Sequence, residues 1–184
     1  LTEEVPVQPC PEGRPTARQD HPSDGRVHGG GLSFPAVSGW RTSDGVAFSW
    51  AYDVGEQIKL VESPNWYANL AVGALFIGDG FDEPRRSAEL SMQCVITSGL
   101  YPYFTDRLDV WSKAVTVDGR RGWSIRADIE VADPDLETKG DTVEVIVVDT
   151  DSPESLSMFI ATVNIGDASL METLDTTIEN LQVE

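Results

Sequence analysis

Apolar and polar side chains alternate most clearly in the stretch that follows Asp118-Gly119. In this stretch the odd-numbered residues from Trp123 to Val131 are apolar, and the even-numbered residues from Ser124 to Glu130 are polar. Such alternation places one face of a strand on a core and the other in water or under a polar layer. The Asp-Gly pair suits a type I′ turn, which needs a positive φ at both central residues. The pattern predicts a β-hairpin and an antiparallel sheet.

Five further runs have strand character. Short turns connect several of them, and short connections favour antiparallel neighbours because parallel strands need long crossovers. We expect an α+β fold in which an antiparallel sheet of about six to seven strands is flanked by helices. The expected strands cover residues 46–53, 57–63, 66–77, 142–149 and 156–163.

Two segments show the period of amphipathic helices. The first covers residues 82–98, with Asp82 as its N-cap and Gly99 at its end. The second covers residues 168–180 and begins after the N-cap Asp167. The apolar stripes of the two helices are Ala88, Met92, Val95 and Ile96 in the first, and Leu170, Met171, Leu174, Ile178 and Leu181 in the second. We expect the second helix to lie on the sheet.

The first 45 residues differ from the rest of the chain. They hold six of the eleven prolines and seven of the sixteen glycines. Such a composition disfavours regular structure. We therefore divide the chain into an irregular N-terminal arm over residues 1–45 and a single α+β domain over residues 46–184.

The two cysteines, Cys10 and Cys94, are either free thiols or one disulfide. Leu90 and Cys94 form a second apolar strip on the helix of residues 82–98, opposite its main apolar face. The arm that carries Cys10 is the obvious cover for this strip, so we predict a Cys10–Cys94 disulfide. In the chain-entropy model, closing a loop of this length stabilises the fold by roughly 4 to 5 kcal/mol. The bond predicts an oxidising compartment outside the cytoplasm.

Charge narrows the range of partners. The 184 residues carry 13 basic and 31 acidic side chains, a formal charge of -18. This charge disfavours binding to nucleic acid and to anionic lipid surfaces. A basic partner or divalent cations would suit the acidic stretch after Arg126, although a solvated acidic surface is the ordinary interpretation. No stretch reaches the ~18 apolar residues of a membrane span, and a membrane anchor preceding Leu1 stays open.

Two motifs resemble nucleotide or hydrolase sites but lack their essentials. Gly78-Asp79-Gly80-Phe81-Asp82-Glu83 would place negative charge where a pyrophosphate binds, so we interpret it as a strand-to-helix turn. Gly31-Leu32-Ser33-Phe34-Pro35 resembles a nucleophile elbow, but it lies in the arm rather than between a strand and a helix. Neither motif predicts a catalytic residue or a cofactor.

Histidine and aspartate pairs suggest metals only weakly. His21 and His28, with Asp20 or Asp24, match no compact zinc pattern, so surface histidines in a loop are the favoured interpretation. Two aspartate pairs could offer oxygen ligands to calcium, but they lack the glycine and the distal glutamate of a calcium loop. Turn aspartates are therefore expected at both pairs, which are Asp133 with Asp135 and Asp149 with Asp151. No metal is predicted.

The aromatic run Tyr101-Pro102-Tyr103-Phe104 is the best candidate for a contact surface. It lies in a loop after a helix, where three rings can present an apolar patch to a ligand or a protein.

A set of short motifs in a fixed order resembles a known family. These motifs are Gly29-Gly30-Gly31-Leu32-Ser33-Phe34-Pro35, Gly39-Trp40, Val117-Asp118-Gly119 with Trp123 and Arg126, and Val145-Ile146-Val147-Val148-Asp149. Over residues 29–184 the chain resembles actinobacterial cell-envelope proteins of the LpqN lipoprotein group and the wider PsbP-like superfamily. The resemblance implies an antiparallel sheet with helices on its faces, an extracytoplasmic location and a binding or accessory role. Gln8-Pro9-Cys10 departs from a lipid-attachment site, which has small residues before the cysteine.

The leading hypothesis is a non-catalytic cell-envelope domain that binds a protein partner or a small hydrophobic ligand. One alternative is an envelope-associated hydrolase that uses Ser33 and a histidine. The other is a structural spacer in an anchored protein.

Overall fold

The computed structural model describes residues 5, 6 and 8–184. A seven-stranded antiparallel sheet forms its centre, in the order β3-β4-β5-β9-β8-β7-β6. Its strands are β3 (Arg41–Ser43), β4 (Tyr52–Glu62), β5 (Trp66–Phe76), β6 (Phe104–Val117), β7 (Arg120–Val131), β8 (Gly140–Val148) and β9 (Ser155–Asn164). A smaller sheet has the order β1-β2-β10 and consists of β1 (Arg26–Gly29), β2 (Leu32–Pro35) and β10 (Gln182–Val183). The expected α+β class with an antiparallel sheet is confirmed.

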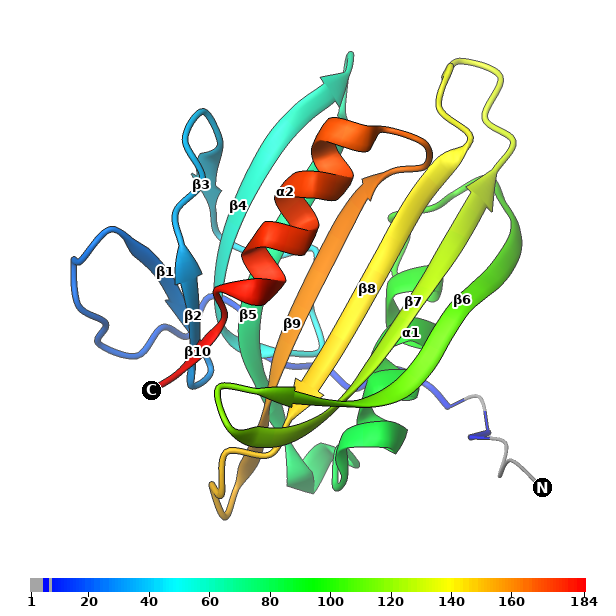
Figure 1. The fold of residues 1–184 in the computed structure, drawn as a ribbon. Helices are drawn as coiled ribbons and strands as arrows, with labels where there is room; N and C mark the ends of the chain where they lie inside the picture. The colour runs from blue at the N-terminus through cyan, green and yellow to red at the C-terminus, as the bar shows by residue number, and fades with distance from the viewer. Residues whose placement is uncertain (1–4, 7) are drawn as a thin grey trace.

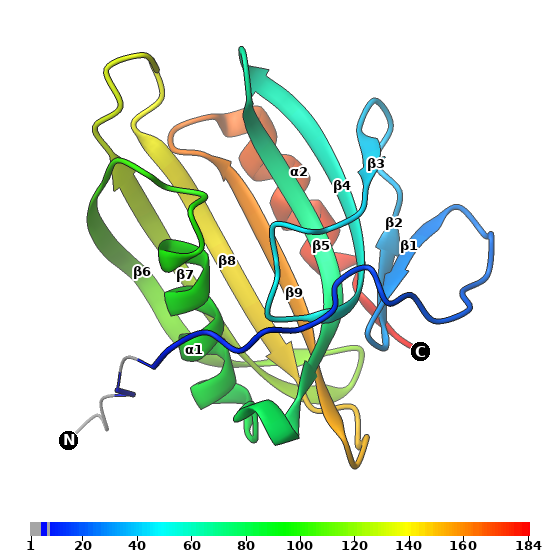
Figure 2. The same cartoon turned by 180° about the vertical axis from the view of Figure 1, so that it is seen from behind.

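One helix covers each face of the large sheet. The helix α1 (Pro84–Thr97) follows a 3-10 turn, η1 (Ile77–Asp79), and α2 (Ala168–Glu179) leads into β10. Figure 1 shows α2 in front of the sheet, and Figure 2, seen from behind, shows α1 in front of it. Two apolar cores result, one between the sheet and α1 and the other between the sheet and α2. Within the described residues, no helix is long and apolar enough to cross a membrane.

The predicted hairpin connects β6 and β7. Asp118 and Gly119 have φ values of 47° and 78°, as the turn requires. The apolar face of β7 packs in the core on the α1 side. On the other face, Ser124 and Arg126 are buried as well. The polar face of β7 is therefore buried at these two residues, and it is not exposed to water there.

The helix ends follow local capping rules, with one correction. α2 begins after Asp167, whose side chain accepts a hydrogen bond from the backbone N–H of Leu170. α1 was expected to begin after Asp82, but its N-cap is Glu83, which accepts from the backbone N–H groups of two residues in the first turn. Pro84 takes the first helical position, where its missing N–H costs nothing.

Residues 46–53 were expected to form a strand, and most of this expectation is wrong. Only the last two of these residues belong to β4, and the rest form a loop that contains turns. Phe48 and Trp50 are nevertheless completely buried, and their rings meet edge to face at 5.8 Å. They are apolar because a loop inserts them into the core, and not because they alternate along a strand.

The region expected to be an irregular arm contains more pairing than its composition predicts. Residues 26–43 include β1, β2 and β3. Gly30 and Gly31 connect β1 to β2, and both have positive φ. A Cβ on Gly30 would lie 1.9 Å from the carbonyl carbon of Gly73, so only glycine allows this turn to pack against β5.

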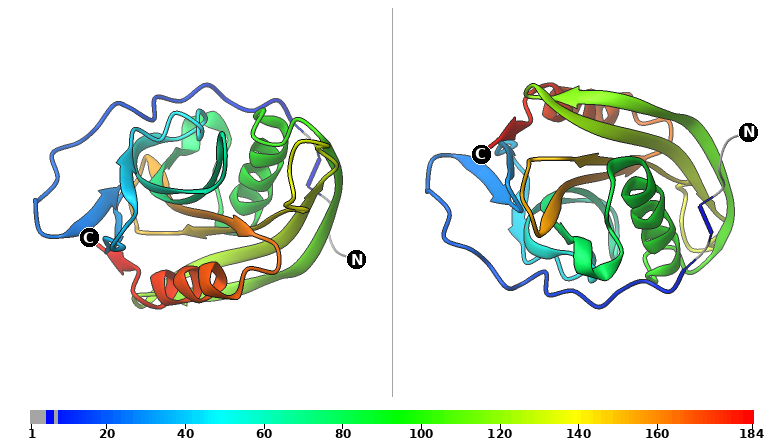
Figure 3. Two further views of the ribbon diagram at one scale, coloured as in Figure 1. Left: turned by 90° about the horizontal axis from the view of Figure 1, so that it is seen from above. Right: turned by 90° about the horizontal axis from the view of Figure 1, so that it is seen from below.

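The preceding part of the arm crosses the α1 side of the molecule. Figure 3 shows α1 enclosed between the curved sheet and this segment. Cys10 is joined to Cys94 on α1, with their Cα atoms 5.6 Å apart. Leu90 and Cys94 are both buried. The arm therefore lies over the strip that the helical pattern marked as needing a cover.

A buried polar cluster sits where the sheet meets the loop after α1. The indole N–H of Trp66 and the hydroxyl of Tyr101 donate to the Asp141 carboxylate at 3.2 and 2.8 Å. Burial raises the pKa of Asp141 to about 7, although both hydrogen bonds oppose the shift. Burial also raises the pKa of Tyr101 well above its usual value, so Tyr101 stays a neutral donor.

We predict that loss of the disulfide destabilises the protein without changing its fold. The double variant Cys10→Ala/Cys94→Ala should lose about 2 to 4 kcal/mol in the free energy of unfolding, because its unfolded chain is no longer constrained. Urea titration of the variant and of the oxidised wild type measures the difference. Reduced wild type is the control and should lose a similar amount. An unchanged unfolding midpoint after reduction would contradict the stabilising role of the disulfide. Alkylation of both thiols without prior reduction would show that the disulfide is absent.

We predict that Asp141 makes stability depend on pH. The folded protein holds this proton more tightly than the unfolded chain, so the contribution is complete below about pH 4 and is lost as pH rises through about 7. Asp141→Asn does not titrate, yet its amide can accept from Trp66 and donate to Tyr101. The free energy of unfolding of the variant relative to wild type should therefore rise by roughly 3 to 5 kcal/mol between pH 4 and pH 8.

Denaturant titrations across this pH range measure the effect of Asp141. Asp106→Asn, at an exposed position on β6, controls for the removal of one negative charge. Parallel pH profiles for wild type and Asp141→Asn would show that the Asp141 carboxyl is not the responsible group.

Candidate functional site

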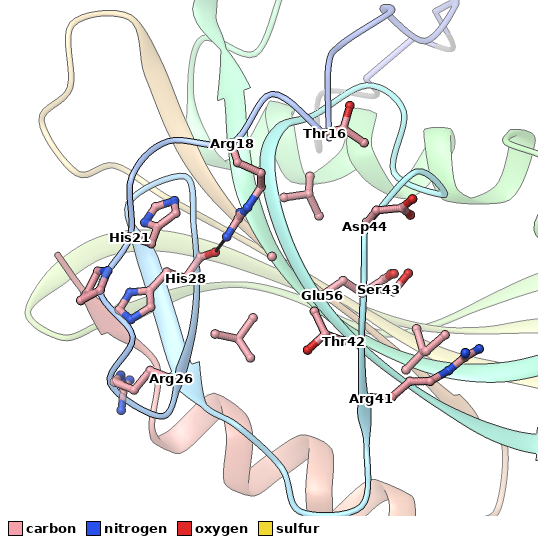
Figure 4. Close-up of a pocket in the computed structure, with 15 residues that line it drawn as sticks. Thr16, Arg18, His21, Arg26, His28, Arg41, Thr42, Ser43, Asp44 and Glu56 are labelled. Carbon is pink, nitrogen blue, oxygen red and sulfur yellow. Dashed lines mark hydrogen bonds between the residues drawn. The ribbon is translucent and has the colours of Figure 1, made fainter.

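An open hollow of about 740 Å³ lies over β4, between β1 and β3 (Figure 4). The arm contributes Arg18 and His21 to its wall, and β1 contributes His28. Val54 and Glu56 of β4 also line it. Burial raises the pKa of Glu56, although a hydrogen bond from the Asn69 amide opposes the shift.

Two histidine rings stack at the wall of this hollow. The ring centroids of His21 and His28 lie 5.6 Å apart, and the planes differ by 12°. Nε2 of His21 lies 2.8 and 2.9 Å from the two carboxylate oxygens of Asp53. Nε2 of His28 lies 2.7 Å from Oδ1 of Asp24, and its Nδ1 contacts Oε1 of Glu184. We call these five residues the histidine cluster.

Asp53 organises the arm around this cluster. It is buried and has a φ of 50°, a left-handed conformation that aspartate tolerates better than most residues. Its carboxylate accepts from the backbone N–H groups of Gln19 and Gly30 at 3.0 and 2.9 Å, and from the Arg18 guanidinium at 3.1 Å. One β4 side chain thus ties the arm and the β1–β2 turn to the large sheet, and it holds His21 in place.

The carboxylates determine the protonation of His28. Burial alone would lower the pKa of His28, but the hydrogen bonds with Asp24 and Glu184 outweigh it and raise the pKa. The hydrogen bond with His28 in turn lowers the pKa of Asp24.

The expectation of surface histidines in a loop is therefore wrong for His28, which is a buried residue of β1. Two members of the histidine cluster were not foreseen, namely Asp53, which contacts His21, and Glu184, which contacts His28. Asp53 lies in a run that resembled an ordinary strand, and Glu184 is 156 residues away from His28 in the chain. No local pattern signals either partnership.

The structure does not assemble the serine and histidine of the hydrolase alternative. Ser33 lies opposite His28 in the β1–β2 register, but it is buried, and its hydroxyl accepts from Nε of Arg26 at 2.9 Å. Both ring nitrogens of His28 face carboxylates. Among the described residues, no hydrogen bond links Ser33 to a histidine, so this arrangement does not activate the hydroxyl.

The aspartate pairs behave as turn residues. The side chain of Asp133 accepts from the backbone N–H of Asp135 at 2.9 Å, and that of Asp149 accepts from Asp151 at 3.0 Å. The glycine motif before α1 forms η1 and the helix start, where the Glu83 carboxylate takes the position of an anion.

Ion pairs of the buried Arg126 hold α2 to the sheet. Arg126 of β7 donates to Glu144 of β8 at 2.6 Å and to Asp175 of α2 at 2.7 Å. Its guanidinium carbon lies 4.3 Å from the centre of the Trp111 ring. Burial alone would lower the pKa of Arg126, but both carboxylates outweigh it and raise the pKa, so the side chain stays charged. These contacts are structural in kind.

The aromatic contact surface needs one correction. Tyr101 is 5% exposed and bound to Asp141, so it belongs to the core rather than to a surface. Tyr103 and Phe104 are 50% and 41% exposed. Leu108 and Val110, which follow on β6, are 47% and 53% exposed. We call Tyr103, Phe104, Leu108 and Val110 the β6 edge residues. The register places Phe104 opposite Val131, on the α1 side of the sheet, and Leu108 opposite Asp128, on the α2 side.

The β6 edge residues lie on an edge strand or, for Tyr103, directly before it. β6 is 14 residues long, and among the described residues it pairs with β7 alone. Its register shifts twice, once just after Phe104 and once between Asp109 and Trp111. Bulges and charged side chains are the usual protection of an open edge. Here large apolar side chains lie among the charges, which is a departure from that protection.

Comparisons with known proteins support the fold. No family model matches the chain, and no curated protein matches it. The structure is similar to the solution structure of cyanobacterial PsbP (CyanoP) from Synechocystis, with a TM-score of 0.52, 15% identity, and coverage of 84% of this chain and 87% of that one. It is also similar to the Ran-binding protein Mog1p from Saccharomyces cerevisiae, with a TM-score of 0.49, 10% identity, and coverage of 83% and 90%. The chain has a PsbP-like fold.

Proposed function

We propose that this protein is a non-catalytic domain that binds a protein partner along β6. The observation that carries the proposal is the exposure of the β6 edge residues, of which three lie on an open edge strand and Tyr103 lies just before it. An edge strand offers a row of backbone donors and acceptors to an extended segment of another chain. Apolar side chains on the same strand supply the burial that such pairing needs.

The surrounding charges narrow the chemistry of the partner. The chain has a formal charge of -18, so an acidic partner would be repelled. β6 itself carries both signs, with Asp106 and Asp109 beside Arg107 and Lys113. A neutral or basic extended segment with apolar side chains fits this edge best.

A small hydrophobic ligand is the weaker form of the same hypothesis. Such ligands favour enclosed, mostly apolar cavities. The hollow beside the histidine cluster is open, and Arg18, Asp44 and Glu56 are among the residues that line it. The exposed apolar surface of the described residues therefore favours a protein partner.

The location is part of the proposal. The Cys10–Cys94 bond supports an oxidising compartment, which corresponds to an extracytoplasmic or cell-envelope setting. The resemblance to actinobacterial LpqN lipoproteins agrees with that setting. We propose that this chain is related to that group.

We predict that β6 cross-links to a protein partner and that a distant apolar site does not. A photoreactive residue at position 108 should capture one discrete protein in envelope extracts of the source organism. The same residue at position 60 is the matched control, because Leu60 is also a leucine with 47% exposure, but it lies on β4 near the other end of the sheet. Mass spectrometry identifies the adduct.

Affinity measurements with the captured protein complete the test. Leu108→Ser/Val110→Ser should weaken binding at least tenfold, because each large side chain contributes about 1.5 kcal/mol or more when buried. Leu60→Ser should bind like wild type. Equal capture at positions 108 and 60 would contradict a β6 interface, and no capture at either position would favour the spacer role.

A further inference from the structure

We propose that His21, His28 and Glu184 form a binding site for a divalent transition-metal ion, with zinc as the best fit. These residues come from the arm, from β1 and from the residue after β10, and the fold brings them together. Figure 4 shows the two histidines at the wall of the hollow. One donor atom of each residue lies within 4.8 Å of the others. Two imidazole nitrogens and one carboxylate oxygen are a ligand set that zinc accepts.

The outer carboxylates orient both rings for this role. A metal-bound histidine usually donates its other ring N–H to a carboxylate, which fixes the tautomer. The Asp53 carboxylate is within hydrogen-bond distance of Nε2 of His21, and the Asp24 carboxylate is within hydrogen-bond distance of Nε2 of His28. The Nδ1 atoms of both rings remain as ligand atoms. Nδ1 of His28 already contacts Glu184. Nδ1 of His21 has no hydrogen-bond partner among the described residues.

The local charge favours a cation. Three carboxylates surround the two rings, namely Asp24, Asp53 and Glu184. Arg18 offsets one of these charges through its contact with Asp53. A bound divalent ion would neutralise the remaining negative charge. It would also replace the direct contact between His28 and Glu184 with two metal–ligand bonds.

The site can contract to a metal geometry. Tetrahedral zinc with bonds near 2.0–2.1 Å places its ligand atoms roughly 3.3 Å apart. The widest separation in the group, up to 4.8 Å, therefore has to shrink by about 1.5 Å. Nδ1 of His28 and Oε1 of Glu184 are already in contact and have to move apart. His21 and Glu184 lie outside the large sheet, on the arm and beyond β10, so they can make this adjustment. The open hollow leaves a fourth position for water.

Isothermal titration with Zn²⁺ tests the proposal on the full chain after treatment with a chelator. We expect one ion per chain and a rise in the melting temperature, because the ion joins three segments. His21→Ala, His28→Gln and Glu184→Gln should each weaken binding at least tenfold. The chain contains only these two histidines, and both cysteines are in the disulfide, so other nitrogen or sulfur side-chain ligands do not compete.

Glu179→Gln is the matched control for Glu184→Gln. It makes the same change at an exposed glutamate of α2, outside the histidine cluster, and should leave Zn²⁺ affinity unchanged. The imidazole signals in NMR spectra should shift with Zn²⁺ in wild type, which reports on the ligands independently of affinity. If His28→Gln fails to fold, His21→Ala and Glu184→Gln carry the test.

Three outcomes would overturn the proposal. One is the absence of binding by folded wild type at millimolar Zn²⁺. Another is equal binding by wild type and both histidine variants, which would indicate weak attraction to acidic side chains. The third is unchanged affinity in Glu184→Gln, which would remove the third ligand. None of these outcomes bears on partner capture by β6, which lies at the other end of the sheet.

Discussion

The fold depends on burying both faces of its central strands. All nine residues of β8 and nine of the ten residues of β9 are buried. Strands that are enclosed on both faces need a cover on each side of the sheet. α2 provides one cover, and α1 provides the other together with the arm that the disulfide holds in place. Polar groups within these layers need partners, which is why Asp141 and Arg126 each sit in a closed set of hydrogen bonds.

Local rules predicted the elements that depend on neighbouring residues. The Asp118-Gly119 turn and the start of α2 follow from conformational and capping preferences over a few positions. The path of the arm followed from an apolar strip on α1 that needed a cover. The same rules failed at residues 46–53, because burial of Phe48 and Trp50 in a loop resembles a strand when only composition is visible. The same rules placed the N-cap of α1 one residue too early, at Asp82 instead of Glu83, because both adjacent residues are acids that can cap a helix.

The candidate sites were much less predictable, because their partners are distant in the chain. His28 looked like a loop residue until β1 formed and Glu184 met its ring. Tyr101 looked like its neighbour Tyr103, and the difference between them is the buried Asp141 carboxylate that accepts from the Tyr101 hydroxyl. A side chain's type states what it can bind, whereas its burial depends on long-range pairing. In this loop the buried carboxylate separates a core tyrosine from an exposed one.

The two ends of the large sheet have different physical characters. At the β3–β4 end, Asp53 draws in the arm, and the small sheet closes over it around the histidine cluster. At the other end, β6 extends beyond the helices with apolar side chains in water. A closed polar end suits an ion that stabilises the fold, and an open apolar end suits a second chain. Because the full width of the sheet separates them, each end can be altered by substitution without disturbing the other.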